Sequence, residues 1–218
     1  SLNTGVFPES LKIAKVIPLY KKSDRSLLEN YRPISLLPCL SKVFEKVVHN
    51  QLYNYFHSQQ LIYIHQHGFR PLHSTETATL EFIDRVLQFI ENDNLPFSIF
   101  IDLSKAFDTL DHSILLSKLA FYGVHGLEWK WFESYLSNRV HYVDIFCSTS
   151  NFQSVSIGVP QGSVLGPLLF LIYVNDINTV SPLFQYILYA DDTTLTSTLS
   201  CFTSHSFALS PAVNQFRT

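Results

Sequence analysis

FQYILYADDTTLT, residues 184–196, is the stretch that decides the fold. Residues 184–189 are aromatic and β-branched, which predicts a strand, and residues 193–196 predict its return. Asp191 and Asp192 then lie at the tip of an apolar hairpin. Two like charges beside apolar strands repel each other and lose hydration unless a cation lies between them. The stretch therefore predicts a divalent metal ion at this tip, with an ordinary polar turn as the alternative.

Two further strings carry chemistry. FIDLSKAFD, residues 100–108, places Asp102 at the end of an apolar strand predicted over 97–103, where its oxygens suit a hard cation. The alternative for Asp102 is a cap of the next helix, a role for which Asp108 or Asp111 is better placed. GVPQGSVLGP, residues 158–167, has glycines that let backbone approach a ligand at a helix start. Its alternative is an ordinary strand-to-helix turn.

The charge of the chain is unevenly distributed. The 218 residues are 46% hydrophobic, which is enough for one large core or two small ones, and their net charge is −3. Residues 1–70 hold nine Lys or Arg and four Asp or Glu, whereas residues 71–218 hold six and fourteen. A basic first third suits phosphates and an acidic remainder suits metal ions. The alternative is a chance excess of solvated lysines.

Targeting signals are not apparent in the sequence. No apolar region opens the chain, and the most apolar stretch, residues 164–174, is too short to cross a bilayer. The three cysteines are widely spaced without a CxxC pair, which indicates reduced thiols. We therefore expect an intracellular protein of the nucleus or cytoplasm, neither secreted nor membrane-bound. The absence of methionine predicts an excerpt from a longer product, or a fragment whose start was not captured.

Hydrophobic spacing predicts helices and strands that alternate irregularly, which favours an α+β fold with helices on one face of a sheet. Helices are expected at 40–56, from a Ser74 cap to residue 90, from a cap at Asp108 or Asp111 to Phe121, around 129–135 and at 164–174. Hairpins are expected at 139–159 and 183–198. Residues 1–38 look extended and rich in loops. The faces expected to be buried are Leu40, Val43, Phe44, Val47, Leu52 and Tyr55 in the first helix, and Leu80, Ile83, Val86, Leu87 and Ile90 in the second.

Taken in order, the strings at 100–108, 158–167 and 189–192 resemble motifs A, B and C of reverse transcriptases, in particular those of non-LTR (LINE-like) retrotransposons. NYRPISLL at 30–37 and QHGFR at 66–70 resemble strings of the fingers of these enzymes. The likeness covers roughly residues 8–198. RNA-virus polymerases more often place Gly before the Asp pair, so they fit less well.

The resemblance implies a right-handed polymerase of the α+β class. Fingers are expected over 1–95, a palm with motifs A, B and C over 96–199, and a poorly determined tail over 200–218. The palm should be an antiparallel sheet backed by helices. The chain is expected to be truncated after motif C, without a thumb, since no lysine of motif D can be placed and Arg217 is a poor general acid.

The resemblance also implies site residues. Asp102, Asp191 and Asp192, with the backbone carbonyl of Leu103, would hold two Mg²⁺ ions, for which Mn²⁺ could substitute. Phe107 would lie beneath the sugar and select dNTPs over NTPs, with core packing as its alternative. The remaining predicted contacts are Gln161 and Gly162 to the nascent base pair and template, Lys21, Lys22 and Arg32 to the triphosphate, and Arg70 more weakly to template or triphosphate.

The function implied is RNA-directed DNA synthesis from dNTPs on an RNA template with a DNA primer. The alternative is a catalytically inactive remnant, or a domesticated module that only binds nucleic acid. The remnant predicts weak, salt-sensitive binding through the basic first third of the chain.

Overall fold

A computed structural model describes residues 1–145 and 148–199. By their internal contacts the residues form two compact units, each built from two separate segments. Of the described residues, unit 1 holds those within 1–61 and 105–173, and unit 2 holds those within 62–104 and 174–199. The described part contains five α-helices and two sheets, which confirms the α+β class. The assignment of fingers to 1–95 and palm to 96–199 stays a prediction, and the predicted tail, 200–218, lies outside the described residues.

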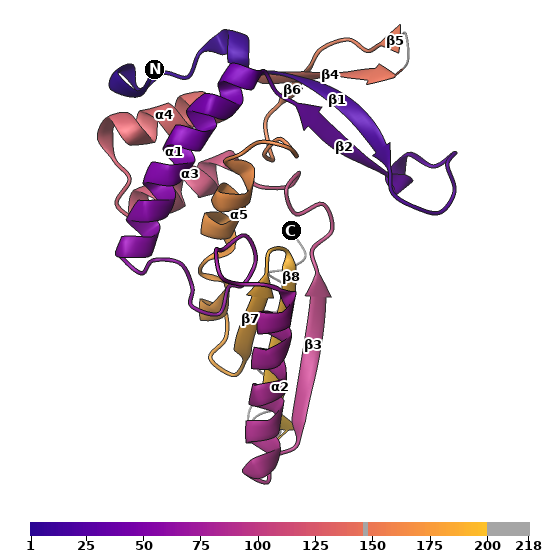
Figure 1. The fold of residues 1–218 in the computed structure, drawn as a ribbon, viewed down its shortest axis with the longest axis vertical. Helices are drawn as coiled ribbons and strands as arrows, with labels where there is room; N and C mark the ends of the chain where they lie inside the picture. The colour runs from indigo at the N-terminus through magenta and orange to yellow at the C-terminus, as the bar shows by residue number, and fades with distance from the viewer. Residues whose placement is uncertain (146–147, 200–218) are drawn as a thin grey trace. The chain divides into compact units, whose positions relative to one another are not determined.

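The sheet of unit 1 begins with a hairpin of β1 (Ile13–Tyr20) and β2 (Tyr31–Leu36), so the segment expected to be loop-rich contains two strands (Figure 1). β4 (Arg139–Ile145) pairs in parallel with β1. β5 (Ser148–Thr149) and β6 (Gln153–Val155) pair antiparallel with β4, which confirms strand pairing in the region predicted as a hairpin.

Four of the helices pack in unit 1: α1 (Cys39–Ser58), α3 (His112–Phe121), α4 (Gly126–Leu136) and α5 (Gly166–Val174). Asp111 caps α3 by accepting hydrogen bonds from the Ser113 and Ile114 amides at 2.8 and 3.0 Å, so it is the cap and Asp108 is not. α5 is buried, as predicted. Within the described ranges, no helix combines the length and the apolar character that a membrane span requires.

The buried face of α1 differs from the expected one. Leu52 is buried as expected, but Leu40, Val43, Val47 and Tyr55 are exposed. The other buried residues of the helix are Ser41, Glu45, Val48 and Phe56. The reason is Glu45, whose carboxylate accepts hydrogen bonds from the Val164 and Leu165 amides at 2.6 and 3.3 Å. Free amides just before a helix require acceptors, and a charged one bonds strongly. The hydrogen bonds of Glu45 therefore decide which face of α1 is buried, in place of the spacing of its apolar residues.

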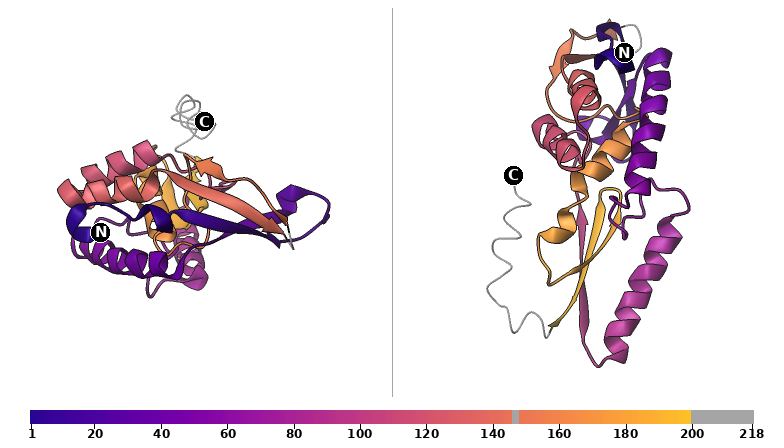
Figure 2. Two further views of the ribbon diagram at one scale, coloured as in Figure 1. Left: turned by 90° about the horizontal axis from the view of Figure 1, so that it is seen from above. Right: turned by 90° about the vertical axis from the view of Figure 1, so that its left-hand side faces the viewer.

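Unit 2 is an antiparallel sheet with one long helix. The strands lie in the order β3 (Pro96–Asp102), β8 (Asp192–Thr198), β7 (Gln185–Tyr189), which confirms the predicted hairpin and its neighbouring strand. α2 (Thr75–Glu91) contacts β7 and β3 and runs along the sheet (Figure 2, right). Short 3₁₀ helices complete the two units at Leu2–Thr4, Glu9–Leu11, Leu28–Asn30 and Ile177–Thr179.

The second helix begins as predicted but buries a different face. Ser74 and Thr77 form a capping box at its start. The predicted apolar face is largely exposed to solvent: Leu80 by 66%, Ile83 by 47%, Leu87 by 51% and Ile90 by 54%. Arg85 is buried instead. A polar network between this helix and the sheet, described below, is the physical reason.

Candidate active site

Three predicted carboxylates meet in unit 2. Tyr189 pairs with Asp192, so Ala190 and Asp191 form a two-residue turn between β7 and β8. Asp102, the last residue of β3, pairs in register with Asp192. Directly paired residues of antiparallel strands point to the same face, with Cβ atoms about 5 Å apart. Asp102 and Asp192 therefore share one face of the sheet, with Asp191 adjacent on the turn.

The charges of this cluster are not balanced. Burial raises the pKa of the Asp192 carboxyl, and the charges of Asp191 and Asp102 raise it further. None of the salt bridges among the described residues involves these three side chains. Carboxylate oxygens are preferred ligands of Mg²⁺ and Mn²⁺, so the cluster suits a divalent cation in donor type and in charge.

The three carboxylates do not form a complete coordination site for a metal ion. Within residues 1–145 and 148–199, no group of three or more His, Cys, Asp or Glu side chains is arranged so that it could hold a metal ion. The structure thus places the predicted carboxylates near one another, but not in an arrangement that would coordinate a single metal ion. Leu103, predicted to add its carbonyl, follows Asp102 directly and is half-buried.

A loop before α2 supports the end of β7. The His67 amide donates to the Leu188 carbonyl at 2.7 Å, and the Leu188 amide donates to the His65 carbonyl at 2.9 Å. Gln66 and Leu188 thereby form a parallel bridge. The resemblance assigns QHGFR to the fingers and gives no indication of this contact with the hairpin.

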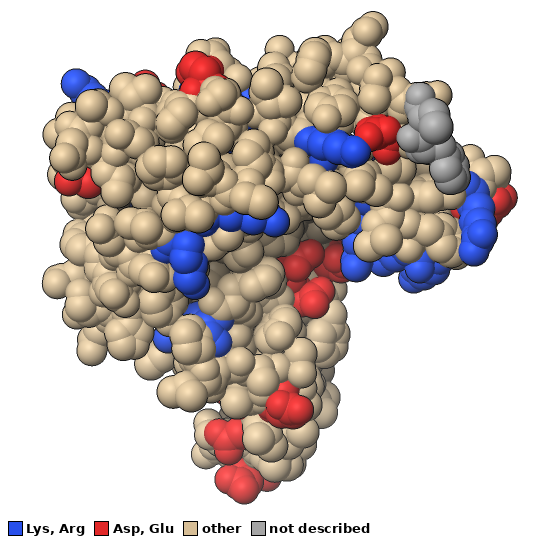
Figure 3. All heavy atoms as spheres, turned by 45° about the horizontal axis from the view of Figure 1, so that its top comes forward, with Lys and Arg blue, Asp and Glu red and all other residues tan. Residues whose placement is uncertain are grey.

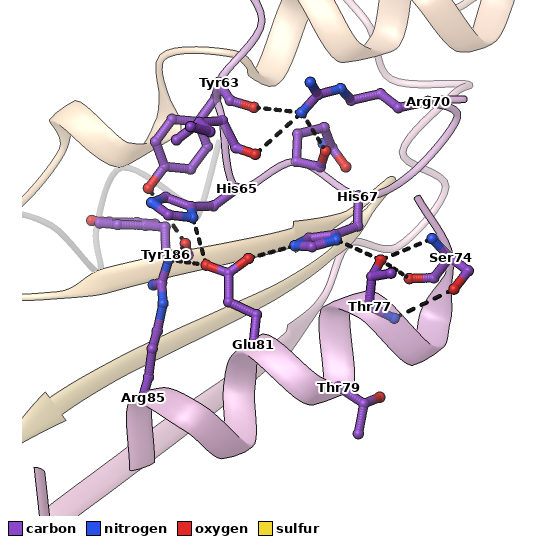
Figure 4. A network of polar contacts seen from close by, with 12 residues as sticks. Tyr63, His65, His67, Arg70, Ser74, Thr77, Thr79, Glu81, Arg85 and Tyr186 are labelled. Carbon is purple, nitrogen blue, oxygen red and sulfur yellow. Dashed lines mark hydrogen bonds and ion pairs between the residues drawn. The ribbon is translucent and has the colours of Figure 1, made fainter. Parts of the chain in front are cut away.

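Glu81 of α2 anchors this loop from the other side (Figure 4). Its carboxylate contacts His65 Nδ1 at 2.5 Å and His67 Nε2 at 2.6 Å, and it pairs with Arg85 of the same helix. Arg85 also donates to the Tyr186 carbonyl in β7 at 3.1 Å. Burial alone would raise the pKa of Glu81, but the bond from His67 and the charge of Arg85 bring that pKa below its usual value. This network explains why α2 turns a polar stripe toward the sheet.

Arg70 has a structural role in the same loop. Its Nη1 donates to the carbonyls of Tyr63, Ile64 and Gln66 at 3.3, 3.2 and 2.9 Å (Figure 4). These bonds direct one end of the guanidinium toward the backbone of its own loop. The contact of Arg70 with template or triphosphate stays a prediction.

The predicted triphosphate contacts belong to unit 1. Lys21 and Lys22 follow β1, and Arg32 pairs with Leu19 across the hairpin. All three basic side chains are exposed, together with Arg25. Figure 3 shows Lys and Arg side chains gathered over the far end of the β1–β2 hairpin. This surface can offer cations to a phosphate.

The glycine string of unit 1 is held against β2. The Gln161 carbonyl accepts a hydrogen bond from the Ser35 amide at 2.7 Å, and Gln161 Nε2 donates to both carboxylate oxygens of Asp108 at 2.9 and 3.0 Å. Gly162 has φ +118°, and a Cβ at this position would lie 2.8 Å from the Ser35 carbonyl oxygen. The glycine is required by both conformation and space.

Phe107 also lies in unit 1. Its ring is 4.7 Å from that of Phe170, with an interplanar angle of 30°, and its carbonyl accepts a hydrogen bond from the Val159 amide at 2.8 Å. The side chain is half-buried. These contacts pack one face of the ring against the core. This arrangement is compatible with both predicted roles, sugar selection and core packing.

The sequence is similar to a known protein family and to several known proteins. Residues 20–208 match the family model described as "Reverse transcriptase (RNA-dependent DNA polymerase)". The probable RNA-directed DNA polymerase from transposon BS of Drosophila melanogaster is 35% identical over 184 residues, 81% of this chain and 19% of that protein. The RNA-directed DNA polymerase from mobile element jockey, of the same species, is 32% identical over 200 residues, 88% of this chain and 22% of that protein. The chain spans about a fifth of the length of these relatives.

The fold is similar to solved telomerase structures. The apo telomerase of Candida tropicalis, truncated from its C-terminal domain, aligns with a TM-score of 0.65 and 14% identity, over 94% of this chain and 47% of that one. The telomerase of Candida albicans, in complex with a fragment of telomeric RNA, aligns with a TM-score of 0.61 and 13% identity. At such identities the likeness concerns the fold alone.

Proposed function

This chain belongs to the reverse transcriptase family and is related to the enzymes of non-LTR retrotransposons, and from this premise we propose that it carries the centre of an RNA-directed DNA polymerase. The proposed reaction transfers a nucleotide from a dNTP to the 3′-hydroxyl of a DNA primer on an RNA template. The observation that supports it most is the register that sets Asp102 opposite Asp192, beside Asp191.

We assign Asp102, Asp191 and Asp192 to the binding of two Mg²⁺ ions, with the Leu103 carbonyl as a further ligand and Mn²⁺ as a substitute. Bound there, the ions would favour loss of the primer hydroxyl proton and stabilise negative charge on the triphosphate and on the departing pyrophosphate. Burial and the charges of Asp191 and Asp102 raise the pKa of Asp192, and a bound cation would offset the repulsion among these carboxylates.

The other site residues would bind and orient the substrates. Arg32, with its planar fork of donors, and Lys21 or Lys22 would hold the triphosphate. Gln161 and Gly162 would lie along the nascent base pair and template, where the lack of a side chain at Gly162 permits close approach.

The test is primer extension by the purified 218-residue chain. With Mg²⁺, dNTPs and a DNA primer annealed to RNA, we expect elongation that EDTA abolishes and that the order of template bases dictates. A folded chain that binds the primed template in a salt-sensitive way but never elongates it would contradict the proposal. That outcome would favour the nucleic-acid-binding remnant.

Phe107 provides a test of sugar selection. Replacing Phe107 with Ala should allow rNTPs to be incorporated, because the bulk proposed to exclude a 2′-hydroxyl is removed. We expect the preference for dNTP over rNTP, measured as the ratio of kcat/KM values, to fall at least about tenfold. Phe170→Ala is the matched control, since it removes the partner ring of the same contact. An equal loss of selectivity in both variants would assign Phe107 to packing alone.

A further inference from the structure

The turn that carries Asp191 contains a residue in an unfavourable conformation. Ala190 has φ +56°, a region that residues other than Gly, Asn and Asp seldom occupy. Ala190 is also buried, so its amide requires an acceptor within the protein. Something beyond the two-residue turn must therefore hold this backbone in place.

Gln66 supplies that acceptor. Its side-chain Oε1 accepts hydrogen bonds from the Ala190 amide at 3.1 Å and from the Gly68 amide at 2.8 Å, and both bonds are buried. Because both partners are donors, the oxygen of the side-chain amide must face them. Gln66 Nε2 has no hydrogen-bond partner in the described part of the chain. Only the acceptor end of the side chain is used.

The backbone of Gln66 is itself fixed from several directions. It bridges to Leu188 of β7, and its carbonyl accepts a hydrogen bond from Arg70 at 2.9 Å. The next residue, His67, lies between Thr77 at 2.9 Å and Glu81 at 2.6 Å, both from α2 (Figure 4). Because this loop is held in place by these bonds, the side chain of Gln66 can fix the position of the turn that contains Ala190.

We propose that Gln66 is a positioning residue, which holds the Ala190 amide and thereby sets where Asp191 and Asp192 present their carboxylates. The inference rests on the proposed function, since it concerns the use of these carboxylates as metal ligands. It assigns the effect to one atom, Oε1 of Gln66. An acceptor of similar reach should replace it, and an apolar side chain of similar length should not.

Hydrogen exchange at the Ala190 amide tests the contact without requiring turnover. Selective ¹⁵N-alanine labelling limits the spectrum to alanine amides, and the signal that is missing in Ala190→Gly is that of Ala190. We expect exchange to be about tenfold faster or more in Gln66→Met, which keeps the length but loses the acceptor. Gln66→Glu, which keeps an acceptor, should retain protection. Gln185→Met, at an exposed position of β7, is the control and should leave this amide unchanged.

Metal binding tests the consequence. We expect the Kd for Mn²⁺, measured by EPR on the same 218-residue proteins, to rise about tenfold in Gln66→Met, with kcat for extension reduced and the KM for dNTP unchanged. Unchanged exchange at Ala190 in Gln66→Met would overturn the contact. Faster exchange with unchanged Mn²⁺ affinity and kcat would overturn the positioning role. If Gln66→Met does not fold, loss of protection in Gln66→Glu would overturn the proposal and its retention would support it.

The same measurements separate this inference from the proposed function. If replacing Asp102, Asp191 or Asp192 left the Mn²⁺ affinity of the wild type unchanged, that result would contradict the polymerase assignment. The exchange rate at Ala190 would still decide whether Gln66 holds the turn.

Discussion

A chain that carries Asp191→Asn and Asp192→Asn is expected to lose primer extension, by at least about a thousandfold, and yet to unfold at a higher temperature than the wild type in metal-free buffer. The first effect follows from removing the proposed metal ligands, a loss of about 4 kcal/mol of transition-state stabilisation. The second follows from removing like charges that repel one another. Activity and stability should thus change in opposite directions.

The pH dependence has a defined sign. The pKa of Asp192 is raised in the folded protein by burial and by the charges of Asp191 and Asp102. The protonated form is therefore favoured on folding, and its stabilising contribution is complete below the unfolded pKa, near 3.8. It is lost as the pH rises through the folded pKa. Above the folded pKa of Asp192 the wild type carries the repulsion among these carboxylates, and the double variant does not.

Thermal unfolding with and without Mg²⁺ measures this effect. Mg²⁺ should raise the Tm of the wild type and leave that of the double variant unchanged. The control Asp84→Asn with Glu91→Gln removes two exposed charges from α2 and should keep both extension and the response to Mg²⁺. A double variant at Asp191 and Asp192 that still extends primers, or responds to Mg²⁺ like the wild type, would contradict the assignment.

Gly68→Ala should disrupt the hairpin turn. A Cβ at position 68 would lie 2.1 Å from the Ala190 nitrogen and 2.7 Å from its Cα. These are backbone atoms, held by Gln66 and by the pairing of β7 with β8, so they cannot move aside cheaply. We expect a loss of about 3 kcal/mol in the free energy of unfolding, as for severe overpacking, together with loss of extension.

Two further variants identify the cause. Gly126→Ala is the control, because φ is +63° there and only the end of the Glu128 side chain lies nearby, at 3.7 Å. Its cost should be about 1 kcal/mol, from backbone strain alone. Adding Ala190→Gly to Gly68→Ala should recover only what Ala190→Gly alone gains by relieving the positive φ, since the clash is with backbone atoms. A larger recovery would show that the Ala190 methyl group is the obstacle instead. Chemical denaturation of the variants measures these differences.

The hairpin and the carboxylates could be predicted because their signals are local. Aromatic and β-branched residues, a turn and paired acids stand within residues 184–196. The position of Asp102 beside this turn is instead implied by the family resemblance, because the strands of Asp102 and Asp192 are far apart in the sequence. The caps at Ser74 and Asp111 are likewise read from a few neighbouring residues.

The buried faces of α1 and α2 could not be predicted in this way. Hydrophobic spacing assigns the apolar stripe to the core, but Glu45 and Arg85 bond to backbone groups that are distant in sequence. The contact of Gln66 with Ala190 spans 124 residues. Such partners depend on the tertiary fold, and one sequence carries no local sign of them.

The interleaving of the two units has a consequence for synthesis on the ribosome. Glu45 emerges 119 residues before Val164, whose amide it binds in the finished fold. At typical rates of translation this interval lasts roughly ten seconds, during which the acid that will be buried has no partner there. Unit 1 can close only when residue 173 has been made, and unit 2 only after β8. The nascent chain therefore completes unit 1 before unit 2. Because each unit consists of two separate segments of the chain, neither unit can be produced alone by shortening the gene from one end.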